Sequence, residues 1–395
     1  MLHDALRGIK VVDLSRILAG PWCTQNLADL GAQVIKVEHP QRGDDTRGWG
    51  PPDQLGPDGQ ARMSAYFMAC NRGKQSVAID FATEDGARQV RELVADADVL
   101  VENYKAGGLK KYGLDYDSLV RINPRLVYLS ITGYGQSGPL ADKPGYDYVF
   151  QGMGGLMSYT GQPDGTPGAG PLRTGVAVVD LMTGMYATSA VLAALRQRDR
   201  DGRGMPLDLC LLDVAVALNA NQAANYLVSG QAPARTGNAH PNCAPYEVFG
   251  CADGHLILAI GNDGQFARFC SVVAQPQWAE DPRFASNSAR LQHMPVLRPL
   301  IAQALAQSPR GHWTAAFDAA GVPWGPIHTL DEVFAHPQVQ HRQMVQRARH
   351  PLLGELKLVR NPLLAGTPAD RLGAAPPLLG EHTAQVLADY GIPER

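Results

Sequence analysis

Residues 10–38 read KVVDLSRILAGPWCTQNLADLGAQVIKVE, and this stretch decides the fold class. An apolar run typical of a buried strand stands at each end, and a helical pattern lies between them. The same alternation continues through residues 76–81 (SVAIDF), 83–97 (TEDGARQVRELVADA) and 98–104 (DVLVENY). Because a helix that connects two neighbouring strands makes them parallel, the sequence predicts an α/β fold with a Rossmann-like, doubly wound, mostly parallel sheet.

The loop inside this stretch argues against a dinucleotide site. Such a site uses the pattern GxGxxG, whose glycines allow a tight turn and a close approach of the backbone to a pyrophosphate. The loop RILAGP at residues 16–21 has Gly20 alone. Hydride transfer with NAD is therefore disfavoured, whereas a ligand with a nucleotide portion remains compatible with the carboxyl ends of the strands.

Composition excludes several classes of protein. The chain has 395 residues, of which 45% are hydrophobic and 18% charged, and a formal net charge of −3, which is typical of a globular protein without a basic footprint for nucleic acid or anionic membranes. The six cysteines form no CxxC motif and have no histidines at ligand spacing, so we expect no metal site. The segment MLHDALRGIKVVDLS lacks the features of a secretory signal, and the predicted location is cytoplasmic.

One aspartate stands in the otherwise apolar segment 174–190, TGVAVVDLMTGMYATSA. A buried carboxylate without a partner is costly, so Asp180 is expected to be solvated, capped, hydrogen-bonded or chemically employed. A helix is predicted to begin just after Asp180 and to end near residues 201–204 (DGRG). Residues 175–195 are long enough to span a membrane, but the aspartate favours a buried core helix.

The chain divides at segments rich in glycine and proline. Residues 1–225 are predicted to form the large domain, and residues 226–245 a linker. Residues 246–330 begin with the alternating pattern of an antiparallel hairpin and are predicted to form a smaller α+β domain. Residues 331–395 are expected to return to the large domain and complete it.

Several segments together resemble the family III CoA-transferases, the family of formyl-CoA and carnitine CoA-transferases that also contains α-methylacyl-CoA racemase. They are GIKVVDLSRILAGPWCTQNLADLGAQVIKVE, NRGKQSVAIDF, DVLVENYKAGGLKKYGLDYDSL, LVYLSITGYGQSGP, GVAVVDLMTGMYA and PPLLGEHTAQVL. The resemblance implies a Rossmann-like large domain and a smaller domain, with a chain that passes between them twice. It also implies an interlocked homodimer.

The family's catalytic aspartate falls on Asp180. The resemblance implies that this carboxylate attacks an acyl-CoA thioester to give an aspartyl anhydride, and that the CoA thiolate then forms an aspartyl-CoA thioester that the acceptor acid attacks. Coenzyme A is then a co-substrate, and no permanent cofactor, ATP or metal is needed. An ordinary aspartate, with a pKa of about 3.9, is ionised at neutral pH. The alternative is that Asp180 caps the helix, and the two roles are compatible.

The CoA contacts of the family fall on ten residues, of which Lys111 is suited to a phosphate: Leu18, Ala19, His39, Ile79, Asn103, Tyr104, Lys111, Thr132, Gly133 and Tyr134. Two of them differ from the formyl-CoA enzyme. His39 replaces an arginine and Leu18 replaces a catalytic glutamine, which disfavours formyl or oxalyl chemistry.

The segment 261–266, GNDGQF, matches a glycine-rich loop that closes over the aspartyl intermediates in the family. Asn262 and Asp263 replace glycines here, so that a stiffer loop is expected. An ordinary hairpin turn is an equally good interpretation, because Asn-Asp-Gly is typical of turns. The residues concerned are Gly261, Asn262, Asp263, Gly264 and Gln265.

The choice between transferase and racemase depends on residue 146. The racemase branch has a histidine before the aspartate at position 147, where this chain has Tyr146, and a tyrosine with an ordinary pKa of about 10 is a poor base. Transferase is favoured, and a catalytically silent CoA-ester binding protein is the alternative of another class. The segments AANYLVSGQ, GNAHPNCAPYEVF, GNDGQF and GVPWGPI most closely resemble the succinyl-CoA:glutarate CoA-transferase branch. Five residues are candidates to bind a second substrate carboxylate: Arg16, Arg47, Arg72, Arg173 and His240.

Overall fold

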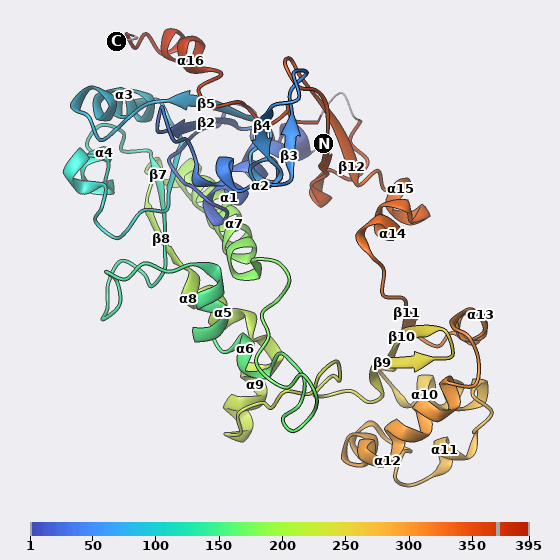
Figure 1. Cartoon of the computed structure of the whole chain (residues 1–395). Helices are drawn as coiled ribbons and strands as arrows, with labels where there is room; N and C mark the ends of the chain where they lie inside the picture. The colour runs from blue at the N-terminus through green and yellow to red at the C-terminus, as the bar shows by residue number, and fades with distance from the viewer. Residues whose placement is uncertain (1, 369–371, 394–395) are drawn as a thin grey trace. The chain divides into compact units, whose positions relative to one another are not determined.

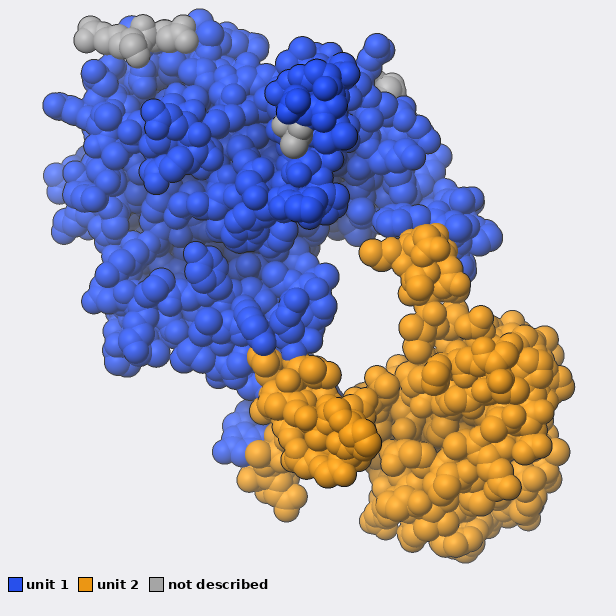
Figure 2. All heavy atoms as spheres, viewed as in Figure 1, with its two compact units in different colours: residues 1–156, 173–227, 334–395 blue, residues 157–172, 228–333 orange. Residues whose placement is uncertain are grey.

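The computed structural model describes residues 2–368 and 372–393 and divides into two compact units. The first comprises residues 1–156, 173–227 and 334–395, and the second comprises residues 157–172 and 228–333 (Figure 2). Each unit is described by itself.

The first unit is built on a six-stranded sheet, and all neighbouring strands are parallel (Figure 1). The strand order is β5-β2-β1-β6-β7-β8, in which the order reverses between β1 and β6. The strands are β1 (Lys10–Asp13), β2 (Gln33–Glu38), β5 (Lys74–Ala78), β6 (Val99–Glu102), β7 (Val127–Thr132) and β8 (Pro206–Cys210). The predicted α/β fold with a parallel sheet is confirmed.

Helices cover both faces of this sheet because the central strands are apolar on both sides. Val11 of β1 belongs to the core beneath α1 and α7, and the next residue, Val12, belongs to the core beneath α3 and α16. The helices of this unit are α1 (Ala19–Asp29), α2 (Ala65–Cys70), α3 (Glu84–Ala95), α4 (Tyr116–Leu119), α5 (Asp147–Met153), α7 (Val178–Asp201), α8 (Leu211–Leu218), α15 (Pro337–His341) and α16 (Thr383–Asp389).

Shorter elements complete the first unit. Two antiparallel pairs are formed by β3 (Asp53–Leu55) with β4 (Ala61–Ser64) and by β12 (Val345–His350) with β13 (Gly354–Val359). The 3₁₀ turns are η1 (Leu2–Asp4), η2 (Asp45–Gly48), η3 (Lys110–Tyr112) and η4 (Pro362–Leu364). The helices at the boundaries between the units are α6 (Leu156–Tyr159), α9 (Ala220–Ser229) and α14 (Leu330–Ala335).

Helix α7 begins two residues before Asp180 and ends at Asp201, where the capping residue Gly202 has a positive φ of 73°. It packs against α1 so closely that a Cβ on Gly184 would lie 2.8 Å from the Ala19 carbonyl oxygen. Among the described residues it is the one helix long and apolar enough to cross a membrane, judged by length and composition. It packs against α1, α8 and β7, while Met185, Tyr186 and Leu192 are exposed in the single chain.

The segment around α16 packs against β5, the edge strand of the six-stranded sheet. The backbone amide of His382 donates to the Ser76 carbonyl at 3.0 Å, and the Thr383 hydroxyl accepts from the Ala78 amide at 2.9 Å. Val386 of α16 is fully buried in the same core as Val12. The C-terminal residues are thus part of the first unit.

The second unit is a small α+β structure. Its antiparallel sheet has the order β11-β10-β9, and Phe249, Phe266, Phe269, Trp313 and Phe317 lie in its core. The elements are β9 (Tyr246–Cys251), β10 (Gly254–Ala259), β11 (Trp324–Gly325), α10 (Asp263–Val272), α11 (Gln277–Glu280), α12 (Asn287–Leu305) and α13 (Arg310–Ala320).

The units differ from the predicted domains at residues 157–172, which the sequence places within the large domain. In the structure this segment belongs to the second unit. The Arg235 guanidinium donates to the carbonyl oxygens of Ser158 at 3.2 Å and Gln162 at 3.3 Å, and the Gly237 amide donates to the Gly161 carbonyl at 3.0 Å. These long-range contacts leave no local pattern in the sequence.

Candidate active site

The main cavity of the first unit lies at the carboxyl ends of β1, β6 and β7. Loops after β1 and β6 diverge at the point where the strand order reverses, which is where α/β sheets usually bind ligands. The cavity has a volume of about 450 Å³. Its lining includes Arg16, Ile17, Leu18, Ala19, Asn103, Tyr104, Lys105, Thr132, Gly133, Lys143, Tyr146, Asp180 and Leu211.

The loop after β1 is held in a strained conformation. Ile17 has a φ of 72°, which is unfavourable for a β-branched residue. Its amide donates to the Asp44 carboxylate at 3.2 Å, while the Asn103 side chain accepts from the Arg16 amide at 2.8 Å and donates to the Arg16 carbonyl at 2.6 Å. These hydrogen bonds fix one wall of the cavity.

Asp44 is itself held by a buried ion pair. The Lys36 ammonium lies 2.9 Å from its carboxylate, and both side chains are fully buried. Burial alone would raise the pKa of Asp44, but the charge of Lys36 and hydrogen bonds from Thr46 bring it to about 2. The carboxylate is therefore ionised at neutral pH and available to hold the Ile17 amide.

Asp180 lies in the first turn of α7 and lines the cavity, with 9% of the residue exposed. Its carboxylate accepts no hydrogen bond from any residue that the structure describes. Burial raises its pKa to about 7, and the nearby charge of Asp147 contributes in the same direction. The expectation of an ordinary aspartate is therefore wrong, because the apolar surroundings penalise the ionised form.

The alternative that Asp180 caps its own helix is also wrong. Ala177 occupies the N-cap position, and the cap is supplied by Asp147 of α5. One carboxylate oxygen of Asp147 accepts from the amides of Val179 at 2.8 Å and Asp180 at 3.2 Å. The other accepts from the side-chain amide of Gln151 at 2.6 Å. Both oxygens of this buried carboxylate are thus engaged by neutral donors.

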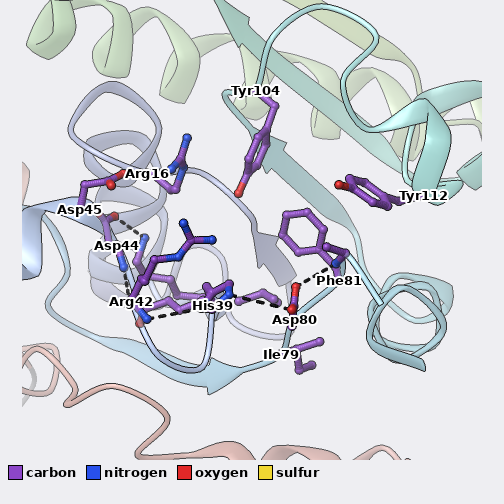
Figure 3. Close-up of a pocket in the computed structure, with 15 residues that line it drawn as sticks. Arg16, His39, Arg42, Asp44, Asp45, Ile79, Asp80, Phe81, Tyr104 and Tyr112 are labelled. Atoms are coloured by element: carbon purple, nitrogen blue, oxygen red, sulfur yellow. Dashed lines mark hydrogen bonds and ion pairs between the residues drawn. The ribbon is translucent and has the colours of Figure 1, made fainter. Parts of the chain in front are cut away.

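A second cavity of about 210 Å³ is shown in Figure 3. It adjoins the first, because Arg16, Asp45 and Tyr104 line both. Phe81 makes edge contacts with Tyr104 and Tyr112, with ring centroids 5.6 and 5.7 Å apart. The titratable side chains along the wall are mixed in charge: Arg16, Lys36, His39 and Arg42 lie among Glu38, Asp44, Asp45 and Asp80. Aromatic rings beside cations suit a flat base with attached phosphates.

The family follows from comparison with known sequences. Residues 6–383 match the model of CoA-transferase family III. The chain belongs to this family. It is therefore a CoA-transferase, and the cavities described above lie in a protein that handles CoA esters.

Relatives of this CoA-transferase cover the whole chain. The succinate–glutarate CoA-transferase of Agrobacterium fabrum is 50% identical over 394 residues, which is 99% of this chain and 96% of the relative. The succinyl-CoA:glutarate CoA-transferase of Homo sapiens is 40% identical over 97% of this chain and 85% of the relative. A CAIB/BAIF family protein from Brucella suis has a TM-score of 0.84 and 47% identity, covering 98% of this chain and 99% of that one.

Eight of the ten residues predicted to contact CoA line the two cavities of the transferase. Leu18, Ala19, Asn103, Tyr104, Thr132 and Gly133 line the larger cavity, and His39, Ile79 and Tyr104 line the smaller one. Lys111 lies over the ring of Tyr112, 4.7 Å from its centroid, and Tyr134 packs edge-on against Phe150. Three cationic side chains of the cavities were not predicted, because their positions in irregular loops carry no periodic signal: Arg42, Lys105 and Lys143.

Of the five candidates to bind a second substrate carboxylate, two are already paired with carboxylates of the protein. The Arg47 guanidinium forms two hydrogen bonds of 2.7 Å with Glu38. Arg72 forms a buried bidentate pair with Asp29. Both guanidinium groups are already bound to carboxylates of the protein, so these two residues are not available to a substrate.

The remaining three candidates lie in different places. Arg16 lines both cavities. Arg173 is exposed and lies over the ring of Tyr148, 5.7 Å from its centroid. His240 belongs to the second unit, where it packs against Tyr246. Arg16 is therefore the candidate that shares a cavity with Asp180.

The segment 261–265 is a helix cap, and the interpretation as a hairpin turn is wrong. It joins β10 to α10. The Asn262 side chain caps the helix by accepting from the Gln265 amide at 2.9 Å, and the Gln265 side chain accepts from the Gly261 amide, just before the cap, at 2.7 Å. Asp263 pairs with the fully buried Arg290 at 2.7 Å. The predicted role of this loop in closing over intermediates stays a prediction, because the loop lies in the second unit.

Within residues 2–368 and 372–393, no group of three or more His, Cys, Asp or Glu side chains is arranged to hold a metal ion.

Proposed function

We propose that this CoA-transferase moves CoA from succinyl-CoA to a short dicarboxylate such as glutarate, and that Asp180 carries the covalent intermediates. The observation behind the second part is the Asp180 carboxylate, which is buried in the wall of the main cavity and has no hydrogen-bond donor among the described residues. The first part is supported by the Agrobacterium fabrum and Homo sapiens relatives, whose names specify succinate or succinyl-CoA together with glutarate.

The proposed reaction exchanges one thioester for another. An Asp180 oxygen attacks the thioester carbonyl, the carbon–sulfur bond breaks, and the products are an aspartyl–succinyl anhydride and CoA thiolate. The thiolate attacks the aspartyl carbonyl and releases succinate. The acceptor carboxylate then attacks the aspartyl-CoA thioester, and the departing thiolate finally attacks the acceptor's own carbonyl, which frees Asp180.

Both intermediates hydrolyse if water reaches them, and the walls around Asp180 reduce that access. Ile17, Leu18, Ile131 and Leu211 contribute apolar surface to the cavity. The burial of Asp180 also reduces the solvent that must be removed from the attacking oxygen.

Arg16 is the proposed contact for the second carboxylate of the acceptor. Its guanidinium pairs with Asp45 at 2.9 Å, where both side chains are partly exposed, and its Nε is buried without a hydrogen-bond partner among the described residues. A partly exposed pair of this kind contributes little to stability, so that a substrate carboxylate can replace Asp45 at small cost.

The experiment that tests the nucleophile is peptide mass spectrometry after incubation with succinyl-CoA and hydroxylamine. Hydroxylamine attacks an aspartyl anhydride or thioester, and we expect a hydroxamate on Asp180 that is absent without the acyl-CoA. The Asp180→Asn variant is the control and should carry no label. A wild-type enzyme that transfers CoA while Asp180 stays unlabelled would contradict the proposed route, and α-proton exchange in heavy water would favour the racemase alternative.

The substrate class is tested separately with a panel of acids. Glutarate should accept CoA with a kcat/KM at least about tenfold above that of butyrate, because a single charged hydrogen bond from a guanidinium contributes about 1.5–3 kcal/mol. Equal rates for both acids would remove the dicarboxylate from the proposal and leave the family unchanged.

The rate should depend on pH through Asp180. Its ionised form is the nucleophile, and its pKa is raised to about 7. We therefore expect kcat/KM to be constant above about pH 8 and to fall about tenfold per pH unit below pH 7. A profile that stays flat down to about pH 5 would show that the carboxylate titrates as an ordinary aspartate.

The interlocked homodimer, the cytoplasmic location and the lack of nucleic acid or membrane partners belong to the same proposal and rest on the sequence analysis alone.

A further inference from the structure

The start of α7 has an unusual distribution of charge and hydrogen bonds. A helix begins with amide groups that have no partner inside the helix, and these amides favour a negative charge beside them. Asp180 lies in this first turn, so that the amides would ordinarily stabilise its own ionised form. In this protein the amides of Val179 and Asp180 donate instead to Asp147 of the neighbouring helix α5.

The orientation of the Asp147 carboxylate is fixed by a hydrogen bond from Gln151. Gln151, fully buried one turn later on α5, donates to the second oxygen of Asp147 at 2.6 Å. The carbonyl oxygen of the same Gln151 amide accepts from the backbone amide of Thr174 at 2.9 Å and from its hydroxyl at 3.2 Å. This fixes the orientation of the Gln151 amide, and it ties α5 to the segment that leads into α7. The carboxylate of Asp147 has no cationic partner among the described residues.

Two groups interact electrostatically with Asp180 in the described structure. They are the Asp147 carboxylate from α5 and the Tyr66 phenol from α2. Burial, together with the charge of Asp180, raises the pKa of Tyr66 to about 12, so this phenol stays neutral at working pH. The cavity is also lined by the titratable side chains of Arg16, Asp45, Tyr104, Lys105, Lys143 and Tyr146.

We propose that Asp147, oriented by Gln151, is a positioning residue that withholds the amides at the start of α7 from Asp180 and so keeps the Asp180 carboxylate basic and reactive. The inference rests on the proposed role of Asp180 as nucleophile. An oxygen that accepts no hydrogen bond has its electron pair free to attack a thioester carbonyl, and a more basic carboxylate is a better nucleophile. Asp147 acts through Asp180 and makes no bond to the substrate.

The test is the pH profile of the Asp147→Asn variant. The asparagine oxygen can still accept from the two amides, while the charge beside Asp180 is removed. We expect the acidic limb of kcat/KM to move to lower pH by about one unit or more, and the rate at the alkaline plateau to fall about threefold to tenfold. Asp199→Asn removes the same charge from the far, exposed end of α7 and should leave both unchanged.

Asp147→Asn places its amide opposite the Gln151 amide, so folding is checked by thermal unfolding. A variant whose rate falls with its stability while the acidic limb stays in place would overturn the inference, because a purely structural cap predicts that result. The hydroxamate experiment keeps the two proposals apart: a labelled Asp180 with an unmoved acidic limb rejects only the role of Asp147. Absence of the label in the wild type rejects the nucleophile itself.

A second measurement uses the wild-type enzyme and needs no variant at position 147. Infrared difference spectra between the wild type and Asp180→Asn, recorded on either side of pH 7, isolate the carboxyl group of Asp180. The proposal predicts the high-frequency carbonyl band of an acid without hydrogen bonds, which disappears as the pH rises through about 7. A carboxylate band at every pH between about 5 and 9 would overturn it.

Discussion

Asp180→Asn is expected to lower kcat for CoA transfer by on the order of 10⁴-fold or more, because an amide cannot form the anhydride through which both half-reactions pass. Binding of CoA should change little, because the cavity walls stay in place. The measurement is a steady-state assay with succinyl-CoA and glutarate, accompanied by the dissociation constant for CoA. A variant that retains a tenth of the wild-type rate would exclude Asp180 as the nucleophile.

The free energy of unfolding of Asp180→Asn, compared with that of the wild type at two pH values, shows whether the variant folds. In the wild type the native state keeps a proton on Asp180 up to about pH 7, whereas the unfolded chain releases it near pH 3.9. The free energy of unfolding of the wild type therefore falls as the pH rises from about 4 to about 7. Asp180→Asn should be the more stable protein, and its advantage should widen across that window to at most about 4 kcal/mol. Chemical unfolding at pH 5 and pH 8 measures the difference.

Asp44→Ala is expected to destabilise the first unit by about 3–5 kcal/mol at neutral pH, because it leaves the fully buried Lys36 ammonium without its partner. The strained turn at Ile17 also loses the acceptor for its amide. The loss should shrink as the pH falls from about 4 toward 2, where the carboxylate of the wild type becomes protonated. Denaturant unfolding at several pH values measures it.

Two variants serve as controls for this effect. Asp45→Ala removes the neighbouring exposed carboxylate, which pairs with Arg16, and should cost less than about 1 kcal/mol. Lys36→Met combined with Asp44→Leu removes both buried charges and should recover much of the lost stability. Equal losses for Asp44→Ala and Asp45→Ala would mean that the buried pair has no special role.

The alternation of apolar runs was sufficient to predict the parallel sheet, because strands buried on both faces have little choice of residue type. Position 180 drew attention because one charge interrupts an apolar helix, but its catalytic role was implied by the family resemblance, and the pattern alone favoured a helix cap. The role of Asp147 was not recognisable, because the capping residue precedes the helix by more than 30 positions and belongs to another element. Arg72 looked like a free cation for the same reason, since Asp29 lies 43 positions away. Arg47 also looked free, because its pairing with Glu38, nine positions away, follows no helix or strand period.

The contact between α16 and β5 has a consequence for the synthesis of the protein. Ala78 and Thr383 are hydrogen-bonded across 305 positions of the chain. At roughly 5–20 residues per second, a ribosome needs about 15 to 60 s to travel from one to the other. During this interval the nascent sheet exposes the apolar surface that Val386 and Leu387 later cover. We therefore expect the apolar surface of β1, β2 and β5 to stay accessible to chaperones until Val386 and Leu387 have been synthesised.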